Sequence, residues 1–131
     1  MTHTSRLLAL VLCIGAASAQ ADGRMRPPAD LDCPRNQLTS YIGVPTRYAR
    51  TKDRITVRIA TESQTVESVT IEARGPDEAR RWLRVDGQPF AAADWPRIER
   101  QPGQLRPGLR VAAWVCDDGR NPLVEFYLPK R

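Results

Sequence analysis

The stretch LRVAAWVCDDGRNPLVEFYL, residues 109–128, decides the fold because it is the longest apolar-rich segment outside the N-terminal leader. Its two arms, Leu109–Cys116 and Leu123–Leu128, have side chains that alternate between two faces. A period of two is typical of β-strands that turn one face to a core. The intervening residues, DDGRN at 117–121, are short polar side chains and a glycine, which favour a turn. The stretch therefore predicts a β-hairpin with one buried face.

The chain begins with the pattern of a secretory signal peptide. Arg6 supplies a positive charge, residues 7–16 are apolar, and an A-x-A cleavage pattern ends at Ala19. The apolar run is shorter than the roughly 20 residues that a membrane-spanning helix needs. We therefore expect residues 1–19 to be a signal peptide. The protein would be exported to the periplasm or the extracellular space, without stable insertion in a membrane.

The rest of the chain is long enough for one domain with a modest core. Residues 20–31 are polar and contain glycine and proline, so we expect a flexible lead-in there and a single domain over residues 32–131. The full chain has a formal net charge of +5, which would fall to +4 with the loss of Arg6. Its basic residues are scattered among the acidic ones, which argues against a nucleic-acid-binding protein.

Cys33 and Cys116 are the two cysteines outside the leader. An even number of cysteines in an exported chain predicts a disulfide. A bridge across so long a loop stabilises a fold by about 4–5 kcal/mol in the chain-entropy model. A nucleophilic or metal-binding cysteine is the alternative, but the single histidine of the chain, His3, lies in the leader. We therefore expect a disulfide, and neither a metal nor a cofactor.

The segment after Cys33 has the spacing of a short helix. Apolar side chains recur at i, i+3 and i+4 between Leu38 and Ile42. Gly43 would cap this helix, and Pro45 would stop it.

Further along the chain, residues 55–60 and 66–73 alternate like strands, and the short polar link between them predicts a hairpin. The sequence GPDE at 75–78 predicts a helix start, with proline in the first turn and two acids against the helix dipole. We expect this helix to give way to a strand near Leu83, followed by a turn at Asp86-Gly87. The elements together predict the α+β class: a small single domain of mainly antiparallel strands, one or two short helices and one disulfide.

Few residues of the domain offer catalytic chemistry. The absence of histidine excludes Ser–His and Cys–His pairs, and no glycine-rich phosphate loop follows a strand. Asp117 and Asp118 could act with Glu125 as paired carboxylates, as in glycoside cleavage, or hold calcium together with Asn121. The same residues are also ordinary turn chemistry. We therefore predict a protein that is not an enzyme.

A basic segment is one of two candidate partner-binding features. Residues 46–54 are predicted to form a solvated loop and contain the densest positive run of the domain. Its basic residues are Arg47, Arg50, Lys52 and Arg54. Such a loop would suit an acidic polymer, which points to an accessory or structural protein of the cell envelope.

Tryptophan side chains are the other candidate feature, because tryptophan is enriched in interface hot spots. Trp95 lies in a loop-like stretch, where we expect a short turn broken by Pro96. Trp114 shares a strand face with Arg110. These residues predict a protein that binds a protein partner by occlusion, as an inhibitor or an immunity protein does.

Two short motifs also carry a family resemblance. The sequence CPRNQLTSYIGVP at 33–45 contains a cysteine, a leucine, an apolar pair and G-x-P, and Arg106-Pro107-Gly108 precedes the central stretch. Both motifs resemble small secreted peptidase inhibitors of the fungal elastase-inhibitor type, which are similar to potato inhibitor I. The resemblance implies an exposed reactive loop from Leu109 to Arg120, with Ala113-Trp114 near the scissile position. Residues 109–120 are thus expected either as a regular hairpin or as a reactive loop.

Overall fold

The computed structural model describes residues 26–130. Its main sheet contains β1 (Leu38–Arg50), β2 (Arg54–Thr61), β3 (Val66–Glu72), β4 (Leu83–Val85), β5 (Gln88–Pro89), β8 (Arg110–Cys116) and β9 (Leu123–Tyr127). The seven strands lie in the order β3-β2-β1-β8-β9-β4-β5. Neighbouring strands are antiparallel, except for β4 and β9, which are parallel. The signal peptide predicted over residues 1–19 lies outside the described residues.

The hairpin predicted within residues 109–128 is confirmed as β8 and β9. The expectation of one buried face is wrong, because β8 is buried on both sides. Val111 and Ala113 belong to the main core, whereas Ala112 and Trp114 belong to a smaller cluster on the outer face. A strand in the middle of a sheet can be covered on both faces, and its alternate positions here are apolar or small rather than charged.

β1 replaces the short helix predicted after Cys33. A single 3-10 turn, η1 (Arg35–Gln37), precedes the strand. β1 then continues through Gly43 and Pro45, with a β-bulge between Pro45 and Arg47. Pairing with β2 and β8 provides hydrogen bonds that a short isolated helix cannot match. The bulge accommodates a proline, which has no N–H to donate to a ladder.

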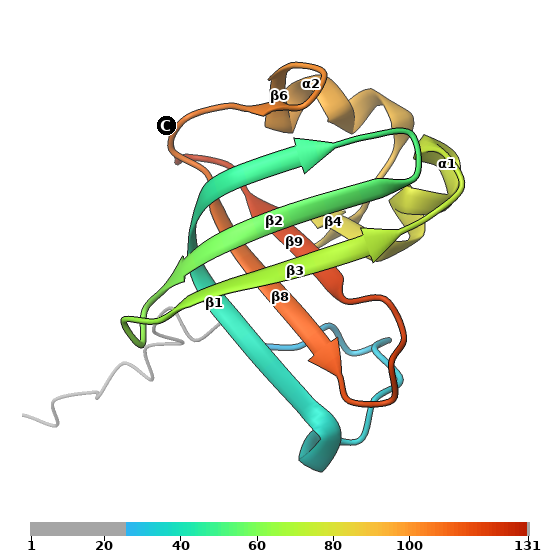
Figure 1. Ribbon diagram of the computed structural model, residues 1–131, viewed down its shortest axis with the longest axis vertical. Helices are drawn as coiled ribbons and strands as arrows, with labels where there is room; N and C mark the ends of the chain where they lie inside the picture. Colours follow the sequence, from blue (N-terminus) through green and yellow to red (C-terminus); the bar gives the residue numbers. More distant parts are fainter. Residues whose placement is uncertain (1–25, 131) are drawn as a thin grey trace, which may run out of the picture.

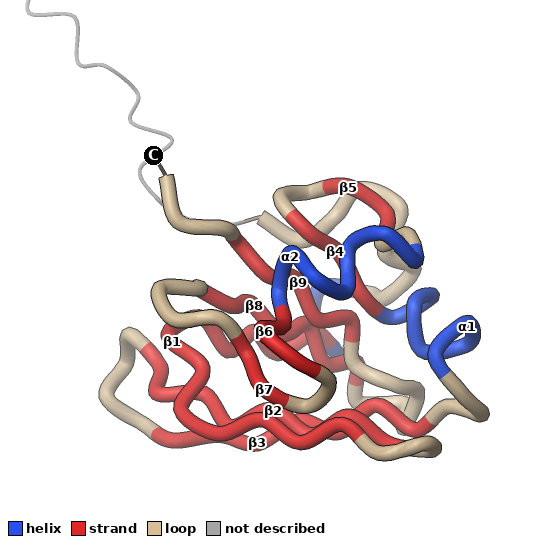
Figure 2. Tube along the Cα trace, turned by 90° about the horizontal axis from the view of Figure 1, so that it is seen from above, coloured by secondary structure: helices blue, strands red, loops and turns tan. Residues whose placement is uncertain are grey.

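β1 also bends, so that its second half carries β2 and β3 across β8 and β9 (Figure 1). Seen from above, β2 and β3 form one layer and β8 and β9 lie over it (Figure 2). The main core fills the space between these layers. Its most deeply buried side chains include Val57, Ile59, Ile71, Val111 and Phe126.

The helix start predicted at residues 75–78 and the turn predicted at Asp86-Gly87 are confirmed, but the helix is short. The predicted helix start yields one turn, α1 (Pro76–Ala79), which continues as a 3-10 turn, η2 (Arg80–Trp82), into β4. Asp86 and Gly87 form the expected turn with positive φ angles of 47° and 77°.

Between β5 and β8 the chain forms two more helical turns and a small hairpin. These elements are η3 (Ala92–Asp94), α2 (Trp95–Ile98), β6 (Glu99–Gln101) and β7 (Gln104–Leu105). The helices lie towards the end of the molecule where β1 turns into β2 (Figure 1). The structure is thus mostly β, because each α-helix of the described chain is a single turn.

The predicted disulfide between Cys33 and Cys116 is present. It fastens the segment before β1 to the outer face of the sheet. Part of the expected lead-in packs there as well: Leu31 contacts the smaller cluster, and Asp30 pairs with Arg84 at 2.5 Å.

Candidate functional site

Glu99 is the buried centre of a polar network that joins β6 to β1. Arg50 donates its Nε to Oε2 at 2.8 Å and its Nη2 to Oε1 at 2.7 Å. The Tyr48 hydroxyl donates to Oε2 at 2.6 Å, and the Gly103 N–H donates to the same oxygen at 3.1 Å. Burial and the contact with Glu99 raise the pKa of Tyr48, and hydrogen bonding to Glu99 raises the pKa of Arg50. Arg50 is thus a fixed cation.

Arg50 stacks on Trp95, which brings together two candidate residues that are far apart in the sequence. The guanidinium carbon lies 4.3 Å from the centre of the Trp95 ring, a cation–π geometry. Trp95 also packs edge to face against Phe90, with ring centroids 4.8 Å apart.

Trp95 is held in place by α2. The sequence predicts that Pro96 breaks the turn around Trp95, and this prediction is wrong. Pro96 lies in the first turn of α2, where proline is tolerated. Asp94 supports the turn, because its carboxylate accepts the Ala91 N–H at 2.8 Å and pairs with Arg97 at 2.8 Å.

A pocket of about 200 Å³ opens beside the Arg50–Trp95 pair. Its apolar lining consists of Ile55, Ile71, Ala73 and Ala79, with Pro76 and Pro102. Lys52 and Arg54 also line it. We call this feature the Arg50–Trp95 pocket. It combines an apolar lining, an aromatic wall and a basic rim.

A shallower depression adjoins this pocket along the turn between β1 and β2. It is lined by three basic and three acidic side chains: Lys52, Arg54, Arg74, Asp53, Glu72 and Glu78. Arg54 and Glu72 form an exposed ion pair at 3.1 Å. The basic run of the sequence is therefore offset by neighbouring acids in the fold.

The other predicted binding residues lie elsewhere. Arg47 is exposed on the second half of β1, so the loop predicted over residues 46–54 is reduced to a short turn after Arg50. Arg110 is exposed at the start of β8, where it pairs with Glu62.

Ala113 and Trp114 are not available to a partner in this structure. They are 0% and 2% exposed, respectively, in the central strand β8. The exposed reactive loop expected from Leu109 to Arg120 is therefore wrong: its first part is a paired strand and only its end is a turn. Pairing with β1 and β9 on both sides is the physical reason.

The acidic turn is occupied by local contacts. Arg120 pairs with Asp118 and lowers the pKa of that carboxyl. Asn121 bonds to the backbone of Glu72, and Glu125 points to the outer face of the sheet rather than joining Asp117 and Asp118. Within residues 26–130, no group of three or more histidine, cysteine, aspartate or glutamate side chains is placed to hold a metal ion.

Sequence reasoning missed Glu99, Tyr48 and the apolar lining of the pocket. Glu99 is one of 15 acidic residues and lies next to arginine in a polar stretch, which gives no sign of burial. Its role depends on a contact between β6 and β1 that the sequence pattern does not contain.

A comparison of the chain with protein-family models, curated proteins and solved structures found no match. The resemblance to peptidase inhibitors therefore stays a prediction. In the part of the chain that the structure describes, no helix has the length and apolar character needed to cross a membrane.

Proposed function

We propose that this chain is an exported, non-enzymatic binding protein that captures a protein partner through the Arg50–Trp95 pocket. The pocket receives an apolar side chain of the partner, and the basic rim contacts an acidic group beside it. The observation that carries this proposal is the stacking of Arg50 on Trp95 at the mouth of an apolar-lined pocket.

The size of the pocket supports recognition of a side chain. A volume of about 200 Å³ is below the roughly 300–1,000 Å³ typical of small-molecule sites. It suits one anchor residue of a larger surface, and such buried anchors dominate the energetics of many protein interfaces.

The preorganisation of Arg50 supports binding as well. Two hydrogen bonds to Glu99 and the Trp95 ring fix the guanidinium before a partner arrives. A partner then avoids much of the entropy loss of ordering a long side chain. The lining of the pocket contains no histidine, cysteine or carboxylate, which favours binding over catalysis.

A protein partner is favoured over an acidic polymer by the distribution of charge. The depression beside the pocket has as many acidic as basic side chains, whereas a polyanion would need a continuous basic surface. An acidic polymer remains the alternative, and it would contact Lys52 and Arg54 without filling the apolar pocket.

The test uses two capped dipeptides as probes, acetyl-Leu-Asp-amide and acetyl-Leu-Asn-amide, titrated into ¹⁵N-labelled protein. We expect the Asp probe to shift the Trp95 indole N–H and the Ala79 amide at lower concentration than the Asn probe. Lys52→Glu should remove this preference, and Ala73→Leu should weaken both probes by filling the pocket. Arg47→Glu is the matched control, because Arg47 lies outside this pocket and should leave binding unchanged.

Two results would overturn the proposal. One is the absence of any shift at Trp95 and Ala79, and the other is equal weakening by Lys52→Glu and Arg47→Glu. Poly-glutamate that binds tightly at low salt, is lost at high salt and is unaffected by Ala73→Leu would favour the polymer alternative.

A further inference from the structure

Two glutamates of the described chain are buried to the same extent but differ in their partners. Glu99 and Glu125 are each 4% exposed, and each accepts a hydrogen bond from a tyrosine hydroxyl, from Tyr48 and Tyr127 respectively. Arg50 also neutralises the Glu99 carboxylate, to which its guanidinium donates two hydrogen bonds. Across residues 26–130, Glu125 has no arginine or lysine within ion-pair distance.

The two residues paired with Glu125 in the sheet explain why its carboxylate forms no ion pair. On β8 the residue paired with it is Ala112, which has no polar side chain. On β4 the paired residue is Arg84, which donates Nη2 to Asp30 instead. The Nε of Arg84 is buried and has no hydrogen-bond partner among the described residues. The Glu125 carboxylate thus has no cation, although the neighbouring strand position holds Arg84, whose Nε donor is unused.

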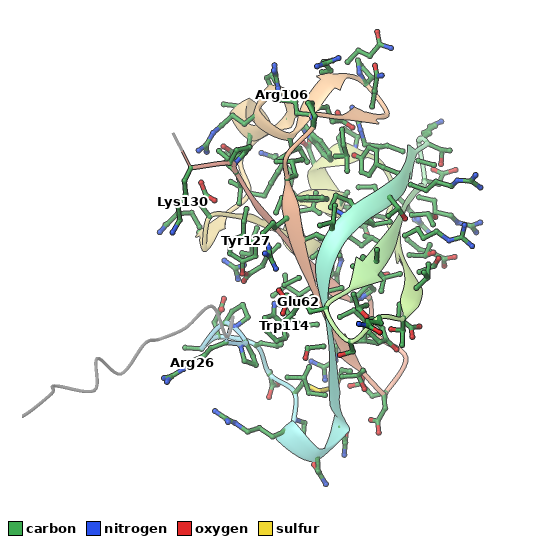
Figure 3. All side chains as sticks on the ribbon, turned by 90° about the vertical axis from the view of Figure 1, so that its left-hand side faces the viewer. Arg26, Glu62, Arg106, Trp114, Tyr127 and Lys130 are labelled. Carbon is green, nitrogen blue, oxygen red and sulfur yellow. A yellow bond between two sulfur atoms is a disulfide. The ribbon has the colours of Figure 1, made fainter. Side chains whose placement is uncertain are left out.

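Glu125 lines a pocket of about 480 Å³ on the outer face of the sheet, which we call the Glu125 pocket. Arg84, Asp86, Gly87 and Tyr127 line it from the sheet side, and Arg26, Pro28, Ala29 and Asp30 from the N-terminal segment. Tyr127 and Arg26 are labelled on this side of the molecule in Figure 3. The lining contains two basic and three acidic side chains, so the pocket favours a cation.

A buried carboxylate without a counter-charge is unfavourable, because it loses its hydration and gains no ion pair in return. We propose that the Glu125 pocket is a second binding site of this protein, and that it takes a guanidinium or primary ammonium group of a ligand. Glu125 supplies the anion, and the Tyr127 hydroxyl fixes the orientation of the carboxylate. This site goes beyond the partner binding proposed at the Arg50–Trp95 pocket and is independent of it.

The network at Glu99 shows why a guanidinium fits better than an ammonium. There, a tyrosine hydroxyl and Arg50 Nε share one carboxylate oxygen, and Arg50 Nη2 takes the other. At Glu125 the tyrosine is already present. A guanidinium from a ligand would complete the same arrangement with two parallel hydrogen bonds, which a point-like ammonium cannot form.

The test measures binding of acetyl-arginine-amide and its neutral isostere acetyl-citrulline-amide by calorimetry and by NMR shifts. We expect the arginine probe to shift the amides of Glu125, Tyr127 and Arg84 and to bind at least tenfold more tightly than the citrulline probe. Acetyl-lysine-amide should fall between them. Glu125→Gln should abolish the preference, whereas Glu62→Gln, which removes an exposed acid outside this pocket, should keep it.

Two additional measurements identify the source of the ligand and check that the variant is folded. Free L-arginine binding as tightly as the capped probe would identify a small-molecule source, whereas a preference for an arginine-containing peptide would identify a side chain of a protein; either supports the site. Thermal unfolding of Glu125→Gln, compared with that of the wild type, verifies that the variant is folded.

The proposal fails if citrulline binds as well as arginine, or if Glu125→Gln binds arginine as the wild type does. It also fails if the wild type binds neither probe, and in that case binding of arginine by Arg84→Ala would identify the cause. A gain of binding in Arg84→Ala would mean that Arg84 pairs with Glu125 in solution and closes the pocket.

Discussion

The side chain of Asn121 forms hydrogen bonds with both backbone polar groups of Glu72, the N–H and the carbonyl. The side-chain oxygen of Asn121 accepts the Glu72 N–H at 2.9 Å, and its amide nitrogen donates to the Glu72 carbonyl at 2.8 Å. A side chain in the turn between β8 and β9 therefore takes the position that another strand would occupy beside β3. This contact ties the free edge of the bent sheet to its centre.

Asn121→Ala should lower the free energy of unfolding by about 1–3 kcal/mol, because it leaves two backbone groups without their partners. Urea unfolding measures the loss, and hydrogen exchange should become faster at the Glu72 amide. Asn36→Ala, at an exposed position in η1, is the control and should change little. Equal unfolding midpoints for the two variants would show that the Asn121 contact does not stabilise the sheet.

Gly43→Ala should destabilise the fold more than Gly119→Ala. A Cβ atom at Gly43 would lie 1.9 Å from the Ala60 carbonyl oxygen, so β1 and β2 would have to separate. Gly119 has a φ of 83° but open space around it, so its substitution costs only about 1–2 kcal/mol of backbone strain. Thermal unfolding of both variants measures the difference, and a smaller loss for Gly43→Ala would contradict the structure.

Glu99→Ala should cost about 3 kcal/mol or more, because it leaves Arg50 partly buried without its counter-charge and Tyr48 without its acceptor. Glu72→Ala breaks an ion pair whose side chains are more than half exposed and should cost less than about 1 kcal/mol. Urea unfolding of the two variants provides the comparison. Similar losses would show that the buried network contributes no more than a surface pair.

Alkaline pH should weaken the fold through Tyr48 and Tyr127. Burial and a neighbouring glutamate raise the pKa of both hydroxyls above the ordinary value of about 10. The unfolded chain therefore loses these protons first, so the stabilisation is complete below about pH 10 and is lost as pH rises towards the folded-state pKa. For Tyr48 the slope reaches about 1.4 kcal/mol per pH unit.

Urea unfolding from about pH 8 to about pH 11 measures this dependence. Absorbance at about 295 nm monitors tyrosine ionisation, and the slope should become smaller in Tyr48→Phe. A free energy of unfolding that stays constant to pH 11 in the wild type would refute the assignment.

The hairpins could be predicted from the sequence because their signals are local. Alternation over residues 55–60, 66–73 and 109–128 lies within each strand, and short turns join neighbours. β1 could not be predicted in this way, because its first half pairs with β8, which lies far along the chain, and because Gly43 and Pro45 interrupt its pattern. Gly43 and Pro45 resemble helix-ending signals, but a close backbone approach and a bulge account for them in the fold.

The candidate site was predicted only by residue type. The sequence identifies Trp95 and Arg50 as an aromatic and a basic side chain, but the position of Arg50 beside Trp95 depends on Glu99, which no sequence pattern marks. The same criterion, an aromatic side chain suited to an interface, also selects Trp114, which is buried in the structure. Side-chain chemistry is visible in a sequence, whereas the long-range contacts that expose or cover it are not.

The Cys33–Cys116 bond joins the segment before β1 to the end of the central strand β8, across a separation of 83 positions. Because the chain is synthesised from its N-terminus, Cys33 is made long before Cys116. During synthesis the hairpin of β2 and β3 can form early. β1 remains without its partner β8 until most of the chain has been made. The disulfide therefore cannot form until the residues of β1, β2, β3 and β8 have all been synthesised.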